Sequence, residues 1–255
     1  MFTKPWKTLS LPALGERVSN LGFDGIELPV RPGFQVEPQD VADALPDAAK
    51  TLATFGVKIF SVAGPTDAVT VRACGEAGVP FIRTMARIGD GVDYHTAVAS
   101  CRETYDALVP LLDEYGVTIG VQNHCNRFVA NAVGLRSLLA GYDPRHVAAV
   151  WDAAHEALNG NEPDLALDVI WPHLCMVNLK NGFWRRVNGP EAEYARWTTY
   201  WTSGRHGLAD WPRVVEELKV RGYQGVVCLT AEYSDHDAVE RLIAEDMAFA
   251  TSLFG

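Results

Sequence analysis

Val117-Thr-Ile-Gly-Val-Gln-Asn-His124 is a short apolar run that ends in polar side chains and is followed by a loop and a helical pattern. Three later stretches repeat this arrangement: Val150-Trp-Asp-Ala-Ala-His155, Met176-Val-Asn-Leu-Lys180 and Val227-Cys-Leu-Thr-Ala-Glu232. The runs are continuously apolar, which is typical of parallel strands covered on both faces. Parallel strands of a barrel end at a common mouth, so we expect these four polar ends to meet there.

Strand and helix patterns alternate along the whole chain of 255 residues. This alternation and length predict one (β/α)8 TIM barrel domain over residues 1–255, with its active-site mouth at the C-terminal ends of the strands. The eighth strand, which is the first along the chain, is expected near Lys4–Leu9, although Pro5 fits a strand poorly. The other strands are expected at 23–28, 57–63, 81–84, 118–123, 146–152, 174–179 and 226–230, and the helices near 38–55, 67–77, 94–115, 133–139, 163–170, 211–220 and 238–253.

Composition limits the partners and the location. The formal net charge is -10, and no basic stripe is visible, so we expect no nucleic-acid partner. We expect no membrane span either, because no run of about 18 apolar residues occurs. Five scattered cysteines without a CxxC pair, and an N-terminus without an apolar leader, predict a cytoplasmic protein. Small neutral substrates fit this charge balance, and phosphate esters remain open if a local basic pocket exists.

The longest segment expected to be irregular runs from Asn181 to Leu208 and would lie at the mouth. It carries six aromatic residues within 183–201: Phe183, Trp184, Tyr194, Trp197, Tyr200 and Trp201. One interpretation is a substrate lid or a sugar-stacking surface, with Trp184 in contact with substrate. The alternatives are an ordinary packing patch or a contact between subunits.

Several motifs together resemble the xylose-isomerase-like barrel superfamily, which includes sugar phosphate isomerases and epimerases and inosose dehydratases. They are Gly22-Phe-Asp-Gly-Ile-Glu-Leu28, Gln122-Asn-His124, Asp152-x-x-His155, Val177-x-Leu-Lys180, Gly207-Leu-Ala-Asp-Trp211 and Gly222-Tyr-Gln-Gly225. The resemblance implies a divalent metal held by Glu, Asp, His and Glu at the positions that are here Gln122, Asp152, Asn178 and Thr230. Only Asp152 matches, so the implied site is degenerate.

The amide oxygens of Gln122 and Asn178 could still join Asp152 around a hard cation such as Mn²⁺ or Mg²⁺. In the epimerases of the superfamily the two metal-bound glutamates also form the acid–base pair. Neither glutamate is present here, and that mechanism cannot be carried over.

Other polar residues at the strand ends are candidates for catalysis. His124 is the better candidate for an acid or base, with a supporting role beside Gln122 as the alternative. His155 resembles the histidine of the Asp-x-x-His motif, or is a satisfied histidine at a helix start. Lys180 could stabilise an enolate or form a Schiff base, and Glu232 could serve as ligand or base. Surface ion pairs are the alternative for these last two residues.

Three further residues are expected to contact substrate. Glu27 lies at the end of the strand expected at 23–28. Arg205 and His206 lie near the end of the long segment before the helix expected near 211–220.

The retained set of Asp152, His155, His124, Lys180 and Glu232 favours a sugar, keto-sugar or cyclitol isomerase, epimerase or lyase that removes a proton next to a carbonyl. A metal-free relative with His124 or Glu232 as the base is the second hypothesis. A non-catalytic sugar-binding barrel, or the structural partner of an active homologue in a hetero-oligomer, is the third, and a homo-oligomer is equally compatible with the sequence.

Overall fold

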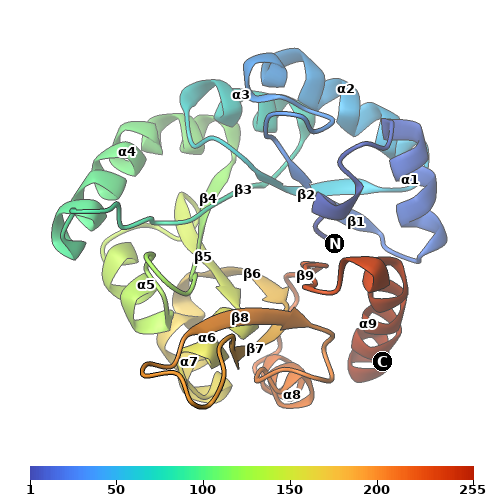
Figure 1. The fold of residues 1–255 in the computed structure, drawn as a ribbon. Coiled ribbons are helices and arrows are strands. Elements are labelled where there is room, and N and C mark those ends of the chain that lie inside the picture. The colour runs from blue at the N-terminus through green and yellow to red at the C-terminus, as the bar shows by residue number, and fades with distance from the viewer.

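Seven parallel strands form a nearly closed barrel with the helices on its outside in the computed structural model, which describes residues 1–255 (Figure 1). The strands are hydrogen-bonded in the order β1-β2-β3-β4-β5-β6-β9. Their bounds are β1 Gly25–Pro29, β2 Lys58–Ala63, β3 Phe81–Thr84, β4 Thr118–Gln122, β5 Val147–Asp152, β6 Leu174–Leu179 and β9 Val226–Leu229. The helices are α1 Leu11–Asn20, α2 Val41–Ala53, α3 Ala68–Ala77, α4 Tyr94–Tyr115, α5 Ala132–Leu139, α6 Ala153–Leu158, α7 Pro163–Ile170, α8 Trp211–Val220 and α9 Val239–Phe254. This architecture confirms the predicted α/β barrel.

The first three residues of the chain occupy the gap between β9 and β1. The Phe2 N–H donates to the Leu229 carbonyl at 2.8 Å, and the Thr3 N–H donates to the Glu27 carbonyl at 3.1 Å. The prediction of an eighth strand near Lys4–Leu9 was therefore wrong by a few residues. Lys4–Trp6 forms a 3₁₀ turn instead. Pro5 lacks the N–H that a ladder needs, and its fixed φ suits the start of a helical turn.

Side chains alternate between the two faces of each strand, and this alternation places polar groups at the mouth. A small apolar cluster fills the inside of the strand ring and consists of Phe2, Ala63, Val150, Met176 and Cys228. Side chains two positions further along a strand point to the same side. Asp152, Asn178 and Thr230 therefore form the next layer toward the C-terminal end. Intervening residues such as Trp151 and Val177 belong to the larger core, between strands and helices.

The segment expected to be irregular contains an antiparallel hairpin. β7 (Asn181–Arg186) pairs with β8 (Trp197–Thr202), and Figure 1 shows the hairpin in orange beside α6. Its base is fixed by the buried Asn181 amide, which donates to the carbonyls of Gly204 and Ala209, both at 2.8 Å. The hairpin explains the aromatic and threonine content of the segment, because such residues suit a half-buried strand surface.

Two helices lie outside the helix ranges that were assigned from the sequence. α1 begins after Ser10, whose hydroxyl accepts from the Ala13 N–H, and α6 begins after Asp152. α6 follows β5 without a loop, so Asp152 ends a strand and caps a helix at once. None of the helices has the length and apolar character required to cross a membrane.

Candidate functional site

A chain of hydrogen bonds joins four strand ends at the mouth. The Arg83 guanidinium donates from Nε to Glu27 Oε1 at 2.7 Å and from one terminal nitrogen to Gln122 Oε1 at 2.5 Å. Gln122 Nε2 donates in turn to Asp152 Oδ2 at 2.8 Å. We call these four residues the mouth belt. It links β1, β3, β4 and β5 and fixes the orientation of each side chain.

The mouth belt is buried, and burial governs its ionisation. Burial alone would lower the pKa of Arg83, but the charge and hydrogen bond of Glu27 outweigh it and hold that pKa above its ordinary value. For Asp152, burial raises the pKa to about 6, opposed by the charge of Lys180. The Asp152 carboxylate also caps α6, since Oδ1 accepts from the N–H groups of Ala154 and His155, both at 3.1 Å.

The four positions that the resemblance assigns to a metal do not fit a hard cation. The Gln122 oxygen accepts from Arg83, and both Asp152 oxygens already accept hydrogen bonds. The Thr230 hydroxyl donates to the Leu179 carbonyl at 3.5 Å. Only the Asn178 oxygen is free, and one free amide oxygen does not make a site for Mn²⁺ or Mg²⁺.

The rings of His124 and His155 are in contact, with their centroids 3.9 Å apart and their planes tilted by 37°. The Cys125 carbonyl, 2.9 Å from His124 Nδ1, can only accept, so this nitrogen carries the proton and Nε2 has the free lone pair. The Cys125 N–H, 3.2 Å from His155 Nδ1, can only donate, so His155 is protonated on Nε2. The two rings therefore offer one acceptor and one donor.

Both histidines are held neutral at neutral pH. Burial lowers the pKa of His124, and Lys180 adds to this effect. Burial, Lys180 and His124 place the pKa of His155 well below its ordinary value. His155 Nε2 is buried without a hydrogen-bond partner and lies 4.0 Å from Asp152 Oδ2. Its donor capacity is therefore available to a molecule in the mouth.

Cys125, the residue after His124, adds a thiol to the two histidines. One ligand atom each from His124, Cys125 and His155 lies within 4.8 Å of the others. Nitrogen and sulfur donors of this kind suit a soft metal such as Zn²⁺ rather than Mg²⁺ or Mn²⁺. The Cys125 thiol has a raised pKa because it is buried, so it is less ready to act as a thiolate ligand.

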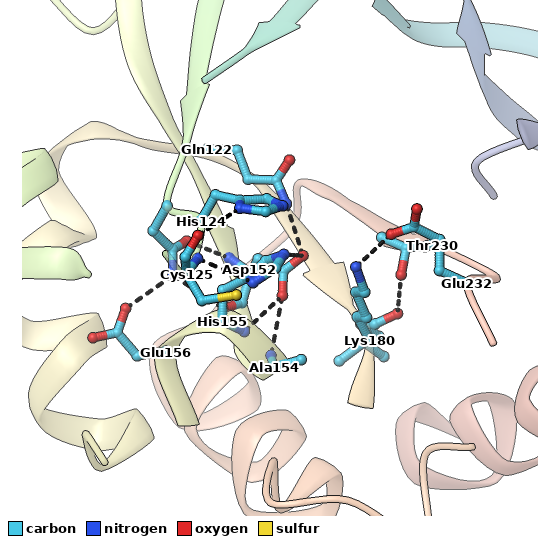
Figure 2. Close-up of polar contacts among 12 residues, drawn as sticks. Gln122, His124, Cys125, Asp152, Ala154, His155, Glu156, Lys180, Thr230 and Glu232 are labelled. Carbon is cyan, nitrogen blue, oxygen red and sulfur yellow. Dashed lines mark hydrogen bonds and ion pairs between the residues drawn. The ribbon is translucent and has the colours of Figure 1, made fainter. Parts of the chain in front are cut away.

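Lys180 lies across the mouth from the histidines (Figure 2). Its ammonium donates to Glu232, which also accepts from Lys4, and it sits 3.5 Å from the centroid of the Trp201 ring. Burial would raise the pKa of Glu232, but the two lysines outweigh this and keep that pKa below its ordinary range. A carboxylate held in this way is a weak base, and the Lys180 side chain is fixed in place by both the carboxylate and the ring.

A cavity of about 110 Å³ opens between these groups. Twelve residues line it: Phe2, Lys4, Arg31, Arg83, Met85, Gln122, His124, His155, Asn178, Lys180, Thr230 and Glu232. A larger cavity of about 520 Å³ lies at the opposite end of the barrel, where Phe23, Phe60 and Val226 make it mainly apolar. We place the candidate active site at the smaller cavity, because the titratable groups meet there.

The structure brings most of the predicted site residues to this cavity. Asp152 does not line it but accepts a hydrogen bond from Gln122, which does, and four further residues lie beside or outside the cavity. Glu27 does not line the cavity and forms an ion pair with Arg83, which does. Trp184 lies on β7 and donates to the Leu158 carbonyl at 2.9 Å. Arg205 stacks on Phe249 and is exposed, and the exposed His206 pairs with the Ser203 hydroxyl. The substrate contacts predicted for these four residues remain predictions.

Sequence reasoning missed several residues that line or flank the cavity. Arg83 is the third of the four residues of β3, and a charged residue inside such a short strand was a usable signal. Phe2 and Lys4 reach the mouth only because residues 1–3 close the barrel. Trp201 belongs to the aromatic segment, but its place beside Lys180 depends on the register of the hairpin.

Residues 16–253 match the model of the family described as xylose isomerase-like TIM barrel. The chain belongs to this family. A search of curated proteins found no significant match.

Several solved structures share the fold of this chain at low sequence identity. A 3-keto-D-glucoside 4-epimerase from E. coli superposes with a TM-score of 0.72 at 13% identity, over 99% of this chain and 98% of that one. A probable 3-DHS dehydratase from Bacillus anthracis gives 0.71 at 14%, over 98% and 97%. A D-psicose 3-epimerase from Clostridium cellulolyticum gives 0.67 at 14%, over 100% and 98%. The similar structures thus include epimerases and a dehydratase.

Proposed function

We propose that this protein is an isomerase, epimerase or lyase that removes a proton next to the carbonyl of a sugar, keto-sugar or cyclitol. The observation that carries the proposal is the complementary histidine pair at the mouth, with a free lone pair on His124 Nε2 and an unpartnered N–H on His155 Nε2. One group can accept the proton while the other donates a hydrogen bond to the oxygen that becomes negative. Family members that act on sugars support this class of substrate.

His124 takes the role of base in the proposed reaction. It is the more accessible ring of the pair, and its lowered pKa keeps Nε2 free of a proton at neutral pH. The proton leaves the carbon next to the carbonyl, its electron pair forms the enediolate, and Nε2 becomes protonated. Return of that proton to the neighbouring carbon gives an isomer, and delivery of a proton to the opposite face of the same carbon, from a donor on the other side of the mouth, gives an epimer. In the lyase reaction the β-hydroxyl takes up the proton from His124 and leaves as water while the enediolate electron pair forms the new double bond.

The enediolate oxygen needs positive charge, and the mouth supplies it without a hard cation. Lys180 and Arg83 both line the cavity and are held in ion pairs with Glu232 and Glu27, respectively. Such fixed charges need no reorganisation during the reaction. Glu232 acts through Lys180 as a positioning residue. Lys180 in its charged form is a stabiliser rather than a Schiff-base nucleophile.

The proposal is tested by exchange of solvent deuterium into keto-sugars, keto-sugar acids and phosphates, and inosose-type ketones, followed by NMR. Exchange next to the carbonyl reports proton removal whether the product is an isomer, an epimer or an elimination product. We expect exchange that persists in a chelator and falls by about a hundredfold or more in His124→Gln. His95→Gln, which changes an exposed histidine on α4, is the matched control.

A complete lack of exchange across the panel would reject catalysis. It would favour a non-catalytic sugar-binding barrel or a structural partner subunit, the reading that the missing glutamates also allow. Exchange that disappears in chelator and returns with Zn²⁺ would move the chemistry to the group of His124, Cys125 and His155. All five cysteines are free, which agrees with the reducing cytoplasm that we propose as its location.

A further inference from the structure

The walls of the mouth cavity carry far more positive than negative charge. Its lining includes four cationic side chains, those of Lys4, Arg31, Arg83 and Lys180, but a single carboxylate, that of Glu232. The chain as a whole has a formal net charge of -10. A local concentration of cations in an acidic protein is not a consequence of composition and calls for a cause within the site.

The carboxylates nearby do not account for all of this charge. Glu27 balances Arg83, and Glu232 is shared between Lys180 and Lys4. Asp152 is the remaining acid, and burial raises its pKa to about 6, which makes its negative charge harder to maintain.

Arg31 is the cation that has no acidic partner. Its one hydrogen bond runs from Nε to the Ala63 carbonyl at 3.3 Å, which leaves both terminal nitrogens free. Its guanidinium lies 5.6 Å from the centroid of the Phe2 ring, and that of Arg83 lies 4.9 Å from the same ring. Burial and the repulsion of Arg83 lower the pKa of Arg31, and the charges of Glu27 and Glu232, neither of which forms an ion pair with it, only partly oppose this. A guanidinium held against such repulsion with free donors is prepared for an anion.

A second, independent observation is the side chain of Asn178. It is fully buried, lines the cavity, and neither its oxygen nor its nitrogen has a hydrogen-bond partner. An unpaired buried amide costs free energy unless a bound molecule satisfies it. It needs both a donor and an acceptor, such as a hydroxyl next to a carbonyl or carboxylate oxygen.

We propose that the substrate of this site is an anionic sugar derivative, with a carboxylate or phosphate group held by Arg31 beside a hydroxyl-bearing carbon frame that reaches Asn178. This inference rests on the proposed function and narrows its substrate class. The size of the cavity limits the frame. At about 10–15 Å³ for each water-sized group, 110 Å³ accommodates roughly seven to eleven non-hydrogen atoms, which corresponds to a short sugar acid or a short polyol phosphate.

The test compares anionic and neutral probes of the same frame by calorimetry on the intact protein. Threonate is measured against threitol, and glycerol 3-phosphate against glycerol, with inorganic phosphate alone as a further probe. We expect at least one anion to bind about ten to a hundred times more tightly than its neutral partner, as a charge-assisted hydrogen bond provides. The carboxylate and phosphate pairs distinguish the two kinds of anion.

Variants of Arg31 decide whether this residue is responsible. Arg31→Gln should remove most of the preference for the anion, and Arg31→Lys should retain part of it because the charge remains. Arg72→Gln, which changes an exposed arginine whose hydrogen bond also runs to a backbone carbonyl, is the matched control and should leave the preference unchanged. Equal affinity for anionic and neutral probes, or a preference that survives Arg31→Gln, would overturn the proposal.

The binding test and the deuterium test fail independently. Anion preference without exchange on any substrate would leave the anion site standing and remove the catalytic proposal. Exchange on neutral keto-sugars without anion preference would support catalysis and overturn the inference about charge. Thermal denaturation of both Arg31 variants verifies that a loss of binding does not reflect a loss of folding.

Discussion

Replacing Arg83 with methionine should destabilise the protein strongly, because Arg83 holds two buried partners at once. Its side chain is 6% exposed and that of Glu27 is 1% exposed. Without the guanidinium, the Glu27 carboxylate keeps only the Ser61 hydroxyl, 3.1 Å away, and the Gln122 oxygen loses its donor. Breaking a buried ion pair by removing one partner costs about 3–5 kcal/mol of unfolding free energy.

A loss of this size is easily measured. At roughly 2–4 °C for each kcal/mol in a chain of this length, the midpoint of thermal denaturation should fall by about 6–20 °C at a pH near 8. The double variant Glu27→Gln with Arg83→Met should recover a large part of the loss, because the buried charge is then absent.

The control is Arg213→Met, which removes an exposed arginine from two surface ion pairs and should cost less than about 1 kcal/mol. An Arg83→Met protein within about 1 kcal/mol of the parent at pH 8 would refute the reasoning, because the mouth belt would then not depend on its cation. A double variant no more stable than Arg83→Met alone would show that lost packing, rather than an unpaired charge, causes the effect.

Three further predictions concern the histidines, the hairpin and the metal. Side-chain ¹⁵N NMR near neutral pH should find the proton on Nδ1 of His124 and on Nε2 of His155. Both pKa values lie below 6.5, so both rings stay neutral above that pH. Any activity that needs neutral His124 should therefore decline only at lower pH. Titration of either ring above 6.5 contradicts this. Gly207→Ala should destabilise by about 1–3 kcal/mol, because an added Cβ would lie 2.0 Å from Asn181 Oδ1, and an unchanged unfolding curve argues against that contact. Addition of Mn²⁺ should leave the thermal midpoint unchanged, and a clear increase that Asp152→Asn abolishes would restore the hard-cation site.

The sequence predicted the barrel well because long-range order there follows from local patterns. Each continuous apolar run had to be a covered strand, and this placed Gln122, Asp152, Asn178 and Thr230 at one end of the sheet. The hairpin of β7 and β8 was missed, because its alternation was read as an aromatic-rich loop. The closing strand was misplaced to Lys4–Leu9, since residues 1–3 pair with strands from both ends of the chain, and no local pattern reports such a contact.

Sequence reasoning placed several residues at the mouth but did not reveal the hydrogen bonds between them. His124, His155 and Lys180 were recognised as mouth residues from their place after apolar runs. Their states depend on partners that the sequence does not reveal, such as the Cys125 backbone that sets both tautomers. Glu232 was considered as a base, and only its position between two lysines makes a supporting role the better proposal.

The mouth belt also constrains how this barrel could change in evolution. Gln122→Glu alone, the simplest step toward the ligand set of the superfamily, would keep the acceptor for Arg83 but turn a second carboxylate toward Asp152 Oδ2. Like charges at that separation repel, and Asp152 would lose the hydrogen bond from the amide. Ancestral or engineered metal binding therefore requires concerted substitutions, with intermediates less stable than either end point. Family members with the metal-binding residues and those with the mouth belt should therefore form separate lineages, and single substitutions between the two sets should be rare.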